Sequence, residues 1–155
     1  MALTAPDPAR SKYRLDPILR NALRRYVRGM EETAHRDLVV GAVKIAESRL
    51  RAAPELSPFV ITDRFGDELE EFEPADLGGA QARLSEFLHT AAGEDACALA
   101  YVSHTGRDED AIVIEHGRAG QREAKVFVQR FRPRRGPLRG FKLLGDLIPA
   151  GEIER

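Results

Sequence analysis

The sequence predicts an α+β domain with one antiparallel sheet of about five strands and helices on one face of that sheet. Two observations lead to this fold class. Segments 17–52 and 77–91 repeat apolar residues at helical spacing. Short runs of alternating or β-branched residues, separated by turn residues, indicate a hairpin followed by a three-strand meander. These runs are 59–64, 68–73, 96–104, 111–116 and 123–132.

Residues 1–15 contain two prolines and few apolar side chains, which predicts a flexible arm. We expect a single domain over residues 16–155. Its first helix begins at Asp16 and Pro17, because an aspartate cap followed by proline is typical of a helix start. The helical pattern then continues to residue 52, shortly before a proline.

The predicted helical segment 16–52 is long for its domain. As one straight helix it would extend about 54 Å, whereas a compact domain of this length has a radius of gyration of only ~15 Å. Two outcomes stay open. The helix breaks near Gly29 or Gly41 into two packed helices, or it stays whole, protrudes from the domain and pairs with a second copy.

The remaining elements are shorter. Pro74-Ala75-Asp76 opens a second helix, and Gly93 ends it. Beyond the meander the chain is rich in Gly, Pro and Arg up to Gly140. The apolar residues that follow, at 141–148, suggest a short last element that returns to the core.

Composition excludes several classes of protein. Cys97 is the only cysteine, so neither an intramolecular disulfide nor a cysteine-based zinc site is possible. It lies among alanines in a predicted strand, where we expect a buried thiol with an elevated pKa and little reactivity. The chain has no apolar stretch of the ~18 residues that spanning a bilayer requires, and its start does not resemble a signal peptide. We therefore expect a soluble, cytoplasmic protein that binds no membrane.

The histidines do not form a metal or catalytic site. His104 and His116 flank one predicted hairpin, but the expected register separates them by about 16 Å. Ser103 and His104 are neighbours in a strand, so their side chains face opposite sides of the sheet. The sequence contains no nucleophile elbow or phosphate loop. We predict no catalytic residues, no metal and no cofactor, and we favour a protein that is not an enzyme.

The net charge of −1 conceals a strong segregation of charge along the chain. Residues 1–52 carry 11 basic and 6 acidic groups, a net charge of +5. Residues 53–116 carry 3 basic and 15 acidic groups, a net charge of −12. Residues 117–155 carry 10 basic and 4 acidic groups, a net charge of +6. This pattern indicates that the charged segments meet a charged partner. That partner is either another molecule or the protein's own chain.

An arginine-rich segment at 130–142 is the strongest candidate for a binding site. Arginine side chains can bind phosphate or carboxylate through paired hydrogen bonds, and interleaved phenylalanines can stack on bases. The segment has three interpretations: a surface for the protein's own acidic block or for assembly, a site for nucleic acid or another polyanion, or ordinary solvated surface. The candidate binding residues are Arg130, Phe131, Arg132, Arg134, Arg135, Arg139, Phe141 and Lys142.

Three functions remain compatible with the sequence. The first is a non-catalytic association or regulatory module that forms a homodimer, mainly through the long helix. The second is a binder of nucleic acid or of an acidic protein through segment 130–142. The third is a small-molecule sensor with a pocket between the sheet and the helices, lined by Tyr101, His104, Glu115 and His116.

Overall fold

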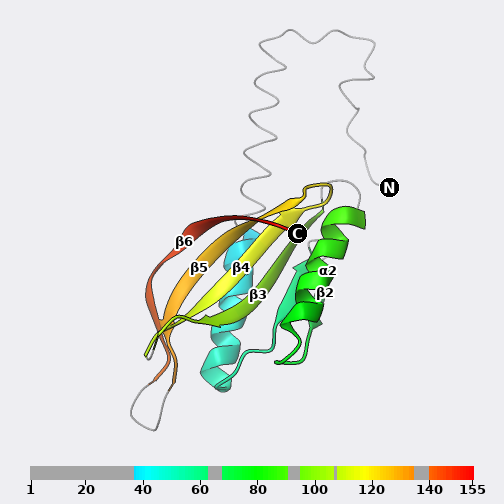
Figure 1. The fold of residues 1–155 in the computed structure, drawn as a ribbon. Helices are drawn as coiled ribbons and strands as arrows, with labels where there is room; N and C mark the ends of the chain where they lie inside the picture. Colours follow the sequence, from blue (N-terminus) through cyan, green and yellow to red (C-terminus); the bar gives the residue numbers. More distant parts are fainter. Residues whose placement is uncertain (1–36, 63–67, 91–94, 107, 135–139) are drawn as a thin grey trace, which may run out of the picture. The chain divides into compact units, whose positions relative to one another are not determined.

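The computed structural model shows a six-stranded sheet with two helices packed on it (Figure 1). It describes residues 37–62, 68–90, 95–106, 108–134 and 140–155, all within one compact unit that spans His35–Arg155. The predicted arm at 1–15 and the predicted helix at 16–36 lie outside the described residues. The division of the chain into an arm and one domain at 16–155 therefore stays a prediction.

All six strands pair in antiparallel fashion, in the order β2-β1-β3-β4-β5-β6. The predicted α+β class, the hairpin and the meander are confirmed. The hairpin is formed by β1 and β2, and the meander by β3, β4 and β5. The strand bounds are β1 Phe59–Thr62, β2 Glu68–Glu71, β3 Ala96–His104, β4 Asp110–Arg118, β5 Glu123–Arg132 and β6 Lys142–Glu154.

The sixth strand, β6, differs from the short last element that the sequence predicts. It is 13 residues long and pairs with β5 along its whole length. The alternation of apolar and polar residues along β6 is interrupted at Gly145 and Gly151, which have φ values of 69° and 121°. Two register shifts against β5 interrupt it further. The strand also contains Pro149. An edge strand tolerates bulges and a proline because its outer side needs no ladder hydrogen bonds.

The two described helical segments cover residues 37–52 and, as α2, Leu77–Thr90. Asp76 caps α2, since its Oδ1 accepts a hydrogen bond of 3.0 Å from the backbone N–H of Gly79. The sequence predicts that the second helix opens at Pro74-Ala75-Asp76, and the cap accounts for this start. None of the described helices has the length and apolar character needed to cross a membrane.

The helices lie on opposite faces of the sheet, so the prediction that both cover one face is wrong. The helix at 37–52 packs on a cluster that includes Ile61 and Ala98, whereas α2 packs on a cluster that includes Val60 and Cys97. Successive residues of a strand point to opposite faces. Strands β1, β3 and β4 carry apolar residues on both faces, and a sheet of this kind needs cover on both sides.

The described part of the first helix uses its apolar side within its own domain. Leu38, Ala42 and Ala46 are buried in the core cluster beneath it. On the other face, α2 approaches β4 closely: a Cβ built on Gly117 would lie 2.4 Å from Cδ2 of Leu88. Gly117 is therefore the residue that lets α2 lie directly on the sheet.

Candidate functional site

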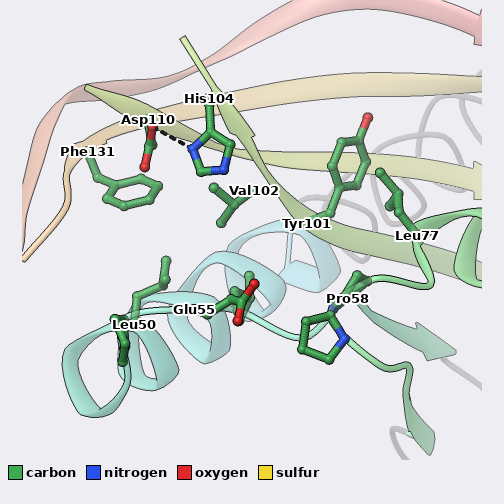
Figure 2. Close-up of a pocket in the computed structure, with 12 residues that line it drawn as sticks. Leu50, Glu55, Pro58, Leu77, Tyr101, Val102, His104, Asp110 and Phe131 are labelled. Carbon is green, nitrogen blue, oxygen red and sulfur yellow. Dashed lines mark hydrogen bonds and ion pairs between the residues drawn. The ribbon is translucent and has the colours of Figure 1, made fainter. Parts of the chain in front are cut away.

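A cavity of about 300 Å³ lies at one end of the sheet, below the β3–β4 hairpin (Figure 2). Four parts of the described chain form its walls: the end of the helix at 37–52 with the loop that follows, the segment that leads into α2, the hairpin itself, and β5 at Phe131. Leu50, Leu56 and Phe131 line it and also belong to the hydrophobic core. The cavity is therefore continuous with the rigid part of the fold.

Three prolines shape the cavity. Pro54 and Pro58 lie in the loop between the first helix and β1, and Pro74 lies in the segment before α2. Proline has no backbone N–H and a fixed φ, so it forms a stiff wall that donates no hydrogen bond. The loops around the cavity are consequently restricted in conformation.

A histidine–aspartate pair supplies polar groups to the cavity. His104 and Asp110 are the last cross-strand partners of β3 and β4, so their side chains share a face. His104 Nδ1 lies 3.0 Å from Asp110 Oδ1, and only 7% of the Asp110 side chain is exposed, against 83% for His104. Because a carboxylate only accepts hydrogen bonds, Nδ1 is the donor. The buried carboxylate thus fixes the orientation of an exposed imidazole.

Tyr101 contributes its ring to the cavity, and its hydroxyl points away from the other cavity residues (Figure 2). That hydroxyl hydrogen-bonds the carboxylate of Glu115. Burial, together with the negative charge of Glu115, raises the pKa of Tyr101 to about 12. The tyrosine is therefore neutral at physiological pH, and its polar end is already engaged.

Glu115 forms a buried ion pair beside this tyrosine. Its side chain is fully buried, and Arg155 donates hydrogen bonds of 2.8 Å and 2.9 Å to its two oxygens. The carboxylate also raises the pKa of Arg155 through these bonds. Because Arg155 and Tyr101 hold the Glu115 carboxylate, its role here is structural.

The structure brings together two of the four residues predicted to line a pocket. Tyr101 and His104 line the cavity, whereas Glu115 and His116 do not. His116 is buried and pairs with Ala98, six residues from His104 along β3. At about 3.3 Å per residue the two histidines lie roughly 20 Å apart. In the part of the chain that the structure describes, no group of three or more His, Cys, Asp or Glu side chains is placed to hold a metal ion.

Cys97 has the environment that the sequence predicts. It is fully buried under α2, and the loss of solvent around it raises the pKa of the thiol to about 12. A thiol that stays protonated is a poor nucleophile. Cys97 is therefore a core residue.

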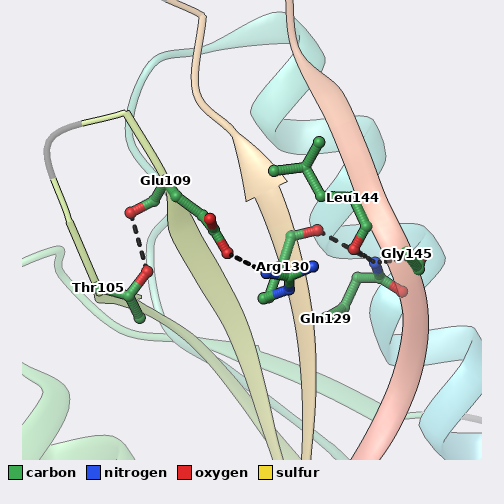
Figure 3. A network of polar contacts seen from close by, with 6 residues as sticks. All are labelled: Thr105, Glu109, Gln129, Arg130, Leu144 and Gly145. Atoms are coloured by element: carbon green, nitrogen blue, oxygen red, sulfur yellow. Dashed lines mark hydrogen bonds and ion pairs between the residues drawn. The ribbon is translucent and has the colours of Figure 1, made fainter.

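Part of the arginine-rich segment forms polar contacts with its own chain (Figure 3). Arg130 makes an ion pair of 3.1 Å with Glu109 in the β3–β4 turn. Next to it, the side-chain amide of Gln129 donates to the carbonyls of Leu144 and Gly145 at 3.4 Å and 3.1 Å. These bonds fix β5 to β6 at the position where their register shifts.

The phenylalanines of the segment are core residues. Phe131 is 1% exposed, and its ring lies 5.2 Å from the ring of the half-buried Phe141. The guanidinium of Arg51 lies over Phe141 at 5.0 Å. With both rings engaged in this way, a polyanion at this surface would have to be bound by charge and not by base stacking.

The other basic residues of the segment are exposed where the structure describes them. Arg132 and Lys142 are direct cross-strand partners on β5 and β6, and like charges in such positions repel each other. Arg134 is exposed nearby. Arg135 and Arg139 lie outside the described residues. The end of the β5–β6 hairpin therefore carries a basic corner, which we define as Arg132, Arg134 and Lys142.

Three ion pairs link the basic outer parts of the chain to its acidic middle. These pairs are Arg49–Glu71, Arg130–Glu109 and Arg155–Glu115. Part of the charge segregation is thus satisfied within a single copy of the chain.

No known family model matches this chain, and neither does any curated protein or solved structure.

Proposed function

We propose that the protein is a non-catalytic ligand-binding module whose cavity below the β3–β4 hairpin takes up a small molecule. The cavity itself supports this proposal most directly. Its volume of about 300 Å³ lies at the lower end of the range for ligand sites, roughly 300–1,000 Å³. Eight of its twelve described lining residues are apolar, and Glu55, Tyr101, His104 and Asp110 place polar groups among them. A small-molecule site combines apolar and polar groups in this way.

The chemistry of the walls favours binding over catalysis. Within the described part of the chain, the residues that line the cavity include no Ser, Thr, Cys or Lys that could attack a substrate. The hydroxyl of Tyr101 is occupied by Glu115. His104 and Asp110 resemble the base and orienting group of a hydrolase, but no nucleophile stands beside them. An oriented imidazole without a nucleophile is suited to hydrogen bonding with a ligand.

A screen of small fragments by ligand-observed NMR tests the proposal. Val102 lines the cavity on β3, so Val102→Phe should fill part of the space. Val126→Phe, at a similarly half-buried position on β5, is the matched control. We expect fragments that bind the wild-type protein to lose binding in Val102→Phe and to keep it in Val126→Phe. Equal binding by both variants, or no binding by the wild-type protein, would refute the proposal.

Self-association is a second candidate function, and edge strand β6 supports it. The outer side of β6 pairs with no other described strand, and Ile148 on it is 51% exposed. The first helix offers less support, because the apolar side of residues 37–52 is buried against its own sheet. The predicted contact through 16–36 lies outside the described residues.

Charge complementarity supports a second copy of the chain as the partner. One end of the β5–β6 hairpin carries the basic corner, and the other end carries Glu123, Glu152 and Glu154. These carboxylates crowd together, and a hydrogen bond to Glu152 raises the pKa of Glu123. Two β6 strands that run antiparallel would bring the basic end of each copy next to the acidic end of the other.

A charge swap tests the self-association. Lys142→Glu and Glu152→Lys should each weaken a dimer measured by light scattering at low salt, and the variant with both changes should restore it. A monomeric mass for the wild-type protein at every concentration would end this second proposal. Retention of nucleic acid by the wild-type protein, lost in Lys142→Glu, would favour a polyanion site instead.

A further inference from the structure

The cavity has an electrostatic character that its shape alone does not reveal. Among the described residues, its lining includes two carboxylates, Glu55 and Asp110, and no Lys or Arg. Its other polar groups are the imidazole of His104 and the hydroxyl of Tyr101, and the latter is turned toward Glu115. A ligand that enters therefore meets hydrogen-bond acceptors and negative charge.

We infer that the ligand of this cavity is a small organic cation, an amine carried on an apolar body. This inference rests on the proposed ligand-binding function and specifies its ligand. The ammonium group would be bound by Asp110 and faced by Glu55 at the exposed side of the cavity. The apolar body would pack against Leu50, Leu56 and Phe131.

Burial makes Asp110 the group that selects for charge. Its side chain is only 7% exposed, and the partner that the described residues give it is an imidazole and not a guanidinium or ammonium group. A carboxylate accepts several hydrogen bonds, so Asp110 can accept one from a ligand as well as the one from His104. Charges interact more strongly in a partly desolvated site than in water. An ammonium group would therefore be attracted.

An anionic ligand would be rejected for the same reason. It would bring a third negative charge to a cavity that holds Glu55 and Asp110, and the described residues of the lining offer no lysine or arginine to balance it. Placing like charges together in this way is an effective means of excluding the wrong ligand. The cavity should thus discriminate between an amine and a carboxylate of the same size.

Isothermal titration calorimetry with matched probes tests this inference. The probes are 2-phenylethylamine, 2-phenylethanol and phenylacetate, which share a phenyl ring and differ in charge. We expect the amine to bind best and phenylacetate not to bind. Asp110→Asn should weaken amine binding about tenfold or more, the loss expected for one charge-assisted hydrogen bond. Asp146→Asn, at an exposed position on β6, is the control and should leave binding unchanged.

The possible outcomes separate the two proposals. If 2-phenylethanol or phenylacetate binds as tightly as the amine, the inferred cation is wrong while the ligand-binding function stands. If no probe binds and the fragment screen also finds nothing, both fall. Should Asp110→Asn fail to fold by circular dichroism, Glu55→Gln serves in its place, because Glu55 is exposed. It should weaken amine binding by a smaller factor, and unchanged binding would count against the inference.

Discussion

Removing Arg155 should destabilise the fold strongly, because its partner Glu115 is fully buried. In Arg155→Met, two hydrogen bonds of 2.8 Å and 2.9 Å are lost, and a carboxylate is left in the sheet with no cation beside it. Breaking a buried pair costs about 3–5 kcal/mol. The Arg155 side chain is 20% exposed, so we expect the lower end of the range. A loss of about 3 kcal/mol would lower Tm by roughly 6–12 °C in a chain of this size.

Urea unfolding followed by circular dichroism measures this loss of stability. Two further variants serve as comparisons. Arg83→Met removes an ion pair to Glu70 of similar length, 2.9 Å, but with side chains 40% and 52% exposed. It should cost at most about 1 kcal/mol. Adding Glu115→Gln to Arg155→Met should recover about 1–2 kcal/mol, because the amide removes the buried charge.

The reasoning would be refuted if Arg155→Met were no more harmful than Arg83→Met. It would also be refuted if Glu115→Gln made the Arg155→Met protein less stable. Either result would show that burial does not govern the strength of the Glu115 pair.

Three further predictions concern the packing of α2 and the buried thiol. Burial raises the Cys97 pKa from 9.0 to about 12, so the folded state favours the protonated thiol. The stability that the protonated thiol contributes is complete below pH 9 and is lost as the pH rises toward 12. When unfolding is measured from pH 8 to 12, the stability of Cys97→Ala should therefore depend less on pH than that of the wild-type protein. Gly117→Ala should lower the free energy of unfolding by about 1–3 kcal/mol, because its methyl group would overlap Leu88. Asp76→Ala should lower it by about 1 kcal/mol, because the cap on Gly79 is lost. Urea unfolding checks both, and an unchanged midpoint would contradict them.

Local signals made much of the fold predictable. The bounds of β3 and β5 match the predicted runs because turn residues mark both ends of each run. Asp76 marks the start of α2 because its side chain accepts a hydrogen bond from the first turn of the helix. The face that each helix covers was not predictable from periodicity, because Ala96–Ala100 is small and apolar on both sides. The buried side of α2 packs on Val60 and Cys97, and Gly117 leaves room there for Leu88.

The candidate site was predictable only in part. Tyr101 and His104 were expected to line a pocket, but Asp110 was missed because the predicted strand began at residue 111. A shift of one residue makes Asp110 the cross-strand partner of His104. Glu55 was missed because a loop residue carries no periodic signal. The prolines at the ends of neighbouring elements were the one local sign that stiff loops meet there.

The most direct test of the account is an NMR structure of the protein with a bound fragment. We expect intermolecular NOEs from that fragment to the methyl groups of Leu50, Leu56 and Val102, which line the cavity. NOEs confined to other surfaces, such as Ile148 on edge strand β6, would contradict it.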